Sequence, residues 1–234
     1  MLYALVAALA ATPDAGVASA PDAGVAMAPD AGVAMAPEVK ALVDRMQAFY
    51  EGTQDFKANF QQVYTYQASK RRQTSSGTVR YKKPGLMRWD YEKPSARTFV
   101  LSGNRVYFYD PEAKLLTRAA IDTNTLSASV TFLLGKGKLA DEFVITQDAC
   151  DKCLGPRLRL VPKRPDPRFK RMALELDPKT AQVLRSVVVE LDGSENAISF
   201  LELGTNVGLD EASFRIATPP DTQVQDFTQP DAGR

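Results

Sequence analysis

The residues of this chain with the most distinctive chemistry are its two cysteines, Cys150 and Cys153. Thiols at this spacing can form a redox-active pair or a short disulfide, whereas a structural zinc site needs two more Cys or His ligands, which the chain lacks. A redox pair normally lies at a helix N-terminus in a βαβ context, and no such pattern surrounds these residues. We therefore expect Cys150 and Cys153 to form a local disulfide that pins a loop.

The chain contains no histidine. This excludes Ser-His-Asp and Cys-His catalysis and removes the commonest general base. Its 28 acidic residues could supply a glycosidase-type carboxylate pair, but most lie beside lysines and arginines or in turns, such as Asp110, Asp177 and Asp192. No P-loop, Rossmann glycine pattern or GxSxG motif is present. We expect no catalytic residues, no metal site and no cofactor, and regard a carboxylate hydrolase as the weaker alternative to a binding protein.

Positive charge gathers in one part of a nearly neutral chain. The chain has 29 basic and 28 acidic residues, so its net charge does not favour nucleic acid. The cluster is either a solvated face or a docking patch for an acidic partner, and its members are Arg71, Arg72, Lys82, Lys83 and Arg88.

Residues 77–91 predict the hairpin that organises the rest of the chain. Two alternating runs flank Pro84-Gly85, where proline presets φ and glycine permits a positive φ. Met87, Trp89 and Tyr91 share one face of the second run, and that face is either ordinary core or the lining of a cavity for an apolar ligand.

The elements around this hairpin are mostly strands. Residues 37–51 have the spacing of an amphipathic helix, with Pro37 in the first turn and Gly52 as a stop. A second apolar stretch covers 126–139; its apolar residues have helical spacing up to Leu134, and Gly135 and Gly137 follow them as a stop or hinges. Strands are expected at 55–66, 77–82, 86–92, 97–102, 105–109, 114–119, 142–147, 157–161, 170–176, 182–190 and 196–203.

This order predicts a mainly β (α+β) fold. About eleven short strands with turns between them form a strongly curved antiparallel sheet or open barrel, and the helices must cover one of its faces. Phe214 and Pro219-Pro220 should close the ordered part.

The ends of the chain differ from this domain in composition. Residues 1–11 are apolar and read as a signal-peptide segment or a frayed apolar start. Residues 12–36 carry a PDAGVAxA repeat with little to bury, which predicts a disordered linker. The domain is expected over 37–227 and a flexible tail over 228–234. An exported chain would also oxidise its cysteine pair.

Several separated motifs resemble the LolA family of periplasmic outer-membrane lipoprotein carriers. They appear in the family's order over about 38–227, and they are Phe56-x3-Phe60-Gln61, Gly77, Lys82-Lys83-Pro84-Gly85-Leu86-Met87-Arg88-Trp89, Ser102 to Pro111, Leu160-Val161-Pro162-Lys163, Phe169-Lys170, Asp177-Pro178-Lys179-Thr180, and Asn206 through Phe214 to Pro219-Pro220.

The resemblance implies a half-open β-barrel of eleven strands, closed by helices over its concave face. It also implies a monomeric periplasmic chaperone without a cofactor. Such a carrier binds the acyl chains of lipoproteins, receives them from an inner-membrane ABC-type release complex and hands them to an outer-membrane acceptor lipoprotein. The residues expected to line the acyl-chain cavity are Phe60, Met87, Trp89, Tyr91, Phe99, Leu101, Val130, Leu133 and Leu134.

Two positions carry the family's expected contacts with the lid and the partner. Lys83 stands where the family usually places an arginine that links the sheet rim to the helical lid; it keeps the charge but loses the planar fork. Met87 stands where the family has a partner-facing aromatic residue. The alternative function is a LolA-like envelope sensor or scaffold that binds a membrane-anchored regulator or another amphiphile.

Overall fold

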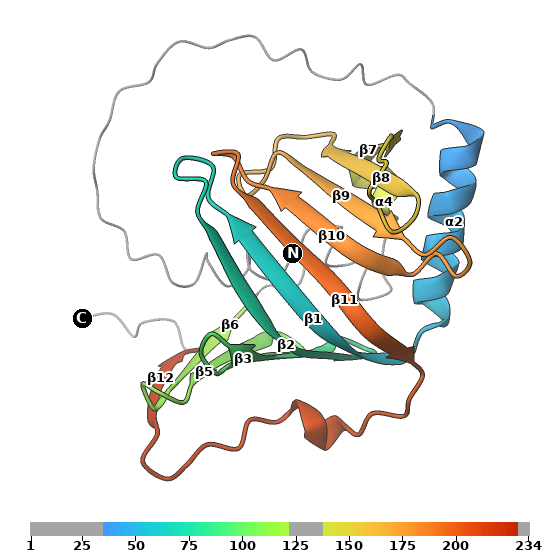
Figure 1. Ribbon diagram of the computed structural model, residues 1–234. Coiled ribbons are helices and arrows are strands. Elements are labelled where there is room, and N and C mark those ends of the chain that lie inside the picture. Colours follow the sequence, from blue (N-terminus) through green and yellow to red (C-terminus); the bar gives the residue numbers. More distant parts are fainter. Residues whose placement is uncertain (1–34, 122–137, 229–234) are drawn as a thin grey trace.

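The computed structural model describes residues 35–121 and 138–228. One mixed sheet dominates these residues (Figure 1). Its strands are β1 (Asp55–Thr65), β2 (Arg72–Lys82), β3 (Leu86–Lys93), β4 (Arg97–Ser102), β5 (Arg105–Asp110), β6 (Leu115–Ala120), β7 (Phe143–Asp148), β8 (Arg157–Pro162), β9 (Arg171–Leu176), β10 (Val183–Val189), β11 (Glu195–Thr205) and β12 (Gln223–Phe227).

The sheet is a meander whose two halves join through the long first strand. The order is β12-β6-β5-β4-β3-β2-β1-β11-β10-β9-β8-β7, so β1 lies between β2 and the last strand of the meander, β11. All pairs are antiparallel except that of β12 with β6. The sheet is strongly curved: β2 runs alongside β1, whereas β3–β6 lie at an angle to them (Figure 1). It does not close, because β12 and β7 remain as its edges.

The expectation of eleven strands was one short for the described residues. The additional strand, β12, follows Pro219-Pro220, where the ordered part was expected to end. It runs parallel to β6, with Val224 opposite Leu116. The prediction of a mainly β, strongly curved sheet is confirmed.

The hairpin of β2 and β3 forms as predicted. Trp89 lies opposite Val79 and Met87 opposite Tyr81, and all four side chains are buried. The turn includes a cis peptide bond before Pro84, and Gly85 has φ 107°. Strand β2 begins five residues earlier than expected, at Arg72.

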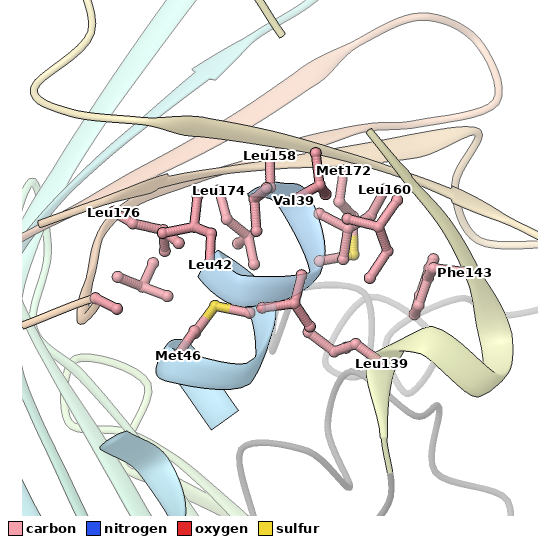
Figure 2. Packing of buried hydrophobic residues seen from close by; sticks show 14 of the residues in the cluster. Val39, Leu42, Met46, Leu139, Phe143, Leu158, Leu160, Met172, Leu174 and Leu176 are labelled. Carbon is pink, nitrogen blue, oxygen red and sulfur yellow. The ribbon is translucent and has the colours of Figure 1, made fainter. Parts of the chain in front are cut away.

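The helix α2 (Pro37–Gly52) covers the β7–β10 half of the sheet. Figure 2 shows Val39, Leu42 and Met46 facing leucines and a methionine that come from β8 and β9. Leu139, from the short helix α4 (Leu139–Glu142), and Phe143 complete this first cluster on one side. The second predicted helix, with Gly135 and Gly137, lies outside the described residues apart from its last residues. A helical cover over the β2–β6 half is therefore not seen in the part of the chain that the structure describes.

A second apolar cluster belongs to β1–β6 and β11. It includes Phe56, Phe60 and Trp89, which alternate with more exposed residues along their strands, and Phe99 and Leu101 of β4. Phe200 of β11 packs against both clusters. The two clusters thus meet along the concave side of the sheet, at β1 and β11.

The segment after β11 leads to the far edge of the sheet and includes the 3-10 helix η2 (Glu211–Phe214). The carboxylate of Asp55 fixes its start, since it accepts hydrogen bonds from the backbone N–H groups of Val207, Gly208 and Leu209 at 2.7–3.0 Å. The buried ring of Phe214 anchors its middle. This segment closes the end of the sheet at which β1 begins.

Candidate functional site: an apolar pocket between two clusters

An apolar pocket lies where the two clusters meet. Its volume is about 60 Å³, which has room for a few water molecules. The lining comes from both halves of the sheet and from the helices α2 and α4, and Ser186 is its one residue with a small polar side chain. The lining residues are Tyr50, Phe56, Val79, Met87, Trp89, Leu139, Met172, Leu174, Val183, Ser186, Ile198, Phe200 and Leu203.

The β-alternation of the hairpin places Met87 and Trp89 in this lining. The Trp89 ring packs edge-on against Phe60, with ring centroids 4.8 Å apart, and also lies 6.3 Å from Phe200. Its indole Nε1 is buried and finds no hydrogen-bond partner among the described residues. The chain's single tryptophan therefore sits at the boundary between the second cluster and the pocket.

The expected cavity residues fall into three groups. Met87 and Trp89 line the pocket itself. The others that the structure describes belong to the second cluster behind it, with Tyr91 only partly buried, and they are Phe60, Tyr91, Phe99 and Leu101. The last group, Val130, Leu133 and Leu134, lies outside the described residues.

Sequence reasoning missed the opposite wall of the pocket. Met172 and Leu174 of β9, together with Ile198 and Phe200 of β11, come from the inner faces of strands that were predicted but not connected to the site. Their period-two spacing was visible, and only the pairing of β11 with β1 brings them opposite the hairpin.

Tyr50 joins the helix to the pocket wall. Its hydroxyl oxygen accepts a hydrogen bond of 3.2 Å from the backbone N–H of Val183, while its ring lines the pocket. Burial raises the pKa of Tyr50 to about 12, which the hydrogen bond from Val183 only partly opposes. The phenol is therefore neutral at physiological pH and adds no charge to the pocket.

Lys83 ties the rim of the sheet to the end of α2. Its ammonium group donates hydrogen bonds to the carbonyl oxygens of Tyr50 at 3.0 Å and Glu51 at 2.8 Å. These carbonyls belong to the last turn of the helix, where a cation is also favoured by the helix dipole. Lysine can thus make, through two single hydrogen bonds, the contact between sheet rim and helix that was expected of an arginine at this position.

Met87 is 1% exposed, so it does not reach the outer surface. Its side chain faces the pocket, and a contact with a partner protein through Met87 would need the pocket to open.

Much of the positive cluster is bound within the molecule. Lys82 donates to the carbonyl oxygen of Leu209 at 2.6 Å, and Arg88 donates to those of Ser213 and Arg215 at 3.2 and 2.7 Å. These bonds hold the segment after β11 against the hairpin. Together with the Lys83 contacts they favour a structural role for this part of the cluster over a docking patch.

Asp90 organises the charges on the convex face of the hairpin. It accepts hydrogen bonds from Arg80 at 2.6 Å, from Arg88 at 2.8 and 2.9 Å and from the hydroxyl of Thr98 at 2.9 Å. Burial alone would raise the pKa of Asp90, but the hydrogen bonds from Arg88 and Thr98 and the two positive charges outweigh it and hold the pKa below its usual value. Asp90 is therefore a carboxylate that orders the strands β2–β4.

Cys150 and Cys153 form a disulfide, with Cα atoms 5.5 Å apart. The Arg157 guanidinium lies 3.7 Å from the Cys153 sulfur and 3.8 Å from the buried carboxylate of Glu175. The disulfide loop thus covers a charged pair on the convex face, away from the pocket.

Within the described ranges, no group of three or more Cys, Asp or Glu side chains is arranged to hold a metal ion. A search of the same ranges found no helix with the length and apolar character needed to cross a membrane.

A bent, unclosed sheet with an apolar pocket on its concave side defines a β-sheet protein whose site suits an apolar ligand. A family model described as "Outer membrane lipoprotein carrier protein LolA" matches residues 51–217. The chain belongs to the LolA family, as the sequence motifs indicated.

Relatives of known name agree with this assignment. The outer-membrane lipoprotein carrier protein of Methylococcus capsulatus is 29% identical over 181 residues, covering 77% of this chain and 85% of its own length. The protein of the same name from Neisseria meningitidis serogroup B is 26% identical, with 78% and 86% covered. A crystal structure of an uncharacterized conserved protein from Thermus thermophilus shares the fold, with a TM-score of 0.54, 14% identity, and 81% and 99% of the two chains covered.

Proposed function

We propose that this protein is a periplasmic carrier that holds the acyl chains of lipoproteins in the pocket between its two clusters. It receives them from an inner-membrane ABC-type release complex and passes them to an outer-membrane acceptor lipoprotein. The observation that carries the proposal is the pocket itself, whose wall is almost wholly apolar and comes from α2, α4 and both halves of the sheet. Membership of the lipoprotein-carrier family supports the choice of ligand.

The pocket has the chemistry that acyl chains require. Each buried methylene contributes roughly 0.8 kcal/mol, so a single long chain can supply ample binding energy. At about 60 Å³ the pocket is too narrow for a whole chain. Loading therefore needs α2 to move from the sheet, with the Lys83 contacts as its fastening at the C-terminal end.

Trp89 fluorescence tests the proposal directly, because this is the only tryptophan and it lines the pocket. Titration with a synthetic triacylated lipopeptide should change its emission with saturation. The pocket-narrowing variant Ser186→Leu should weaken binding about tenfold or more. Ser199→Leu is the matched control, since Ser199 neighbours Ile198 on β11 but faces the other side of the sheet.

Two results would argue against a carrier. If the Trp89 emission spectrum stays unchanged at a high concentration of lipopeptide, the pocket is not the binding site for acyl chains. Lipopeptide binding without release of lipoprotein from inner-membrane vesicles that contain the ABC complex would favour the sensor or scaffold instead.

A further inference from the structure

A second pocket, with a polar lining, lies farther along the same strands. It has a volume of about 140 Å³, and Gln62, Tyr64, Tyr66, Gln73 and Ser75 line it. Gln62 and Tyr64 continue the series Phe56, Ala58 and Phe60, so by strand alternation they belong to the concave face. Gln62 pairs with Ser75 and Tyr64 with Gln73 across β1 and β2. One face of one hairpin thus changes from apolar to polar along its length.

The lining of this second pocket is polar but uncharged. The Gln62 amide is 3% exposed and donates a 2.9 Å hydrogen bond to Asn196, which is also 3% exposed. The rings of Tyr64 and Tyr66 meet edge-on at 4.7 Å, and the Tyr66 hydroxyl donates to Gln73 at 3.3 Å. Amides, hydroxyls and aromatic edges are the groups that recognise neutral polar ligands.

The charged neighbours of this pocket are already engaged. The Tyr64 hydroxyl donates to Glu190 at 2.7 Å, and the Arg71 guanidinium lies 4.8 Å from the centroid of the Tyr66 ring. Burial, with the hydrogen bond to Glu190, raises the pKa of Tyr64 to about 12, so its phenol remains a neutral donor. Among the described residues no lysine or arginine lines the pocket, whereas a phosphate would call for such a group.

The two pockets lie at different positions along β1. Phe56 lines the apolar pocket and Gln62 the polar one, and six residues of strand span roughly 20 Å. Phe60 lies between them, its ring against Trp89 and Tyr91 at 4.8 and 5.0 Å. The opposite end of β1 is closed by α2, Lys83 and the segment after β11.

We propose that the Gln62–Ser75 pocket binds the uncharged ester and amide groups that join acyl chains to a polypeptide, while the chains occupy the apolar pocket. This inference rests on the proposed function and names a second subsite for the same ligand. Burying ester and amide groups among apolar side chains without hydrogen bonds is costly, so the head of the ligand must leave the apolar pocket. The polar end of the concave face supplies donors and acceptors for it.

Two probes separate the subsites. The apolar dye N-phenyl-1-naphthylamine reports the apolar pocket by its own fluorescence, and a triacylated lipopeptide displaces it by using both pockets. Ser75→Leu puts an aliphatic side chain into the polar pocket. Thr74→Leu is the matched control, because Thr74 is the next residue on β2 and is exposed on the other face.

Ser75→Leu should raise the Kd for lipopeptide about tenfold and leave the dye Kd within twofold of the unchanged protein. Thr74→Leu should change neither value. The inference is overturned if Ser75→Leu binds lipopeptide as tightly as the unchanged protein does. It is also overturned if the substitution raises the Kd for the dye and the Kd for lipopeptide by the same factor. Failure of the unchanged protein to bind lipopeptide at all would be a different result, which removes the proposed function and this subsite with it.

Discussion

Removing the charge of Lys83 should loosen α2 from the sheet. In Lys83→Met the side chain keeps its length but can no longer donate to the carbonyls of Tyr50 and Glu51. Hydrogen bonds from a charged donor contribute about 1.5–3 kcal/mol when sheltered, and a cation at a helix C-terminus about 0.3–1 kcal/mol. Because Lys83 is partly exposed, we expect a loss of only about 1–2 kcal/mol in the free energy of unfolding.

Two measurements test this expected loss of stability. Urea denaturation gives the free energy of unfolding by linear extrapolation. In Lys83→Met the backbone amides of residues 48–51 should exchange hydrogen faster than in the unchanged protein. The amides of β9 should exchange at the same rate in both, because the effect is local to the end of the helix. Lys83→Arg, which keeps the charge, should stay within about 0.5 kcal/mol of the unchanged protein.

The control is Lys57→Met, at an exposed position on β1. It removes one positive charge without touching the helix. The reasoning is refuted if Lys83→Met leaves both stability and local exchange unchanged, or if Lys57→Met lowers stability equally.

Three further perturbations test other parts of the fold. Gly77→Ala should cost about 2 kcal/mol or more in urea unfolding, because its Cβ would lie 1.9 Å from the backbone oxygen of Asp90. Asp90→Asn should flatten the acid limb of stability measured from pH 5 to 2. The pKa of Asp90 is lowered on folding, so its contribution is present above the unfolded value near 3.9 and disappears as pH falls through the folded one. Cys150→Ser should lower the unfolding free energy by at most about 2 kcal/mol, because the loop to Cys153 is short.

The strands were predictable where one face is buried and the other is not. In β3 the alternation of Met87 and Trp89 with Arg88 and Asp90 gave both the strand and its inner face, and the burial pattern agrees. Strand β12 was missed because all its residues are exposed, so no apolar face marks it. The first residues of β2 were missed for the same reason, since Arg72 to Thr74 are exposed.

The part of the pocket wall that comes from β10 could not be derived because a register irregularity sets which of its side chains point inward. Strand β10 shifts its pairing between Val183 and Arg185, so Val183 and Ser186 both line the pocket although they are three residues apart. A continuous run such as Val187 to Val189 gives no alternation from which the inner face could be read.

The roles of the basic residues were also out of reach. Lys82 and Arg88 donate to backbone carbonyls 125–127 residues away, and Lys83 donates to carbonyls 32 and 33 residues away. Every residue has a backbone carbonyl, so the sequence does not identify which one accepts a hydrogen bond. A lysine or arginine that is bound within the molecule therefore cannot be distinguished from an exposed one by sequence alone.

The narrowness of the pocket bears on how a carrier can release its ligand. A chain of about 16 carbons would gain roughly 12 kcal/mol on complete burial, more than a transfer step can easily give back. In this protein the ligand must first replace contacts that the closed form already makes, such as those of Tyr50 with Val183 and of Lys83 with the end of α2. The measured affinity is then the gain from burial less the free energy of opening. Variants that stabilise the closed form should therefore bind acyl chains more weakly, and Lys83→Met should bind them more tightly although it unfolds more easily.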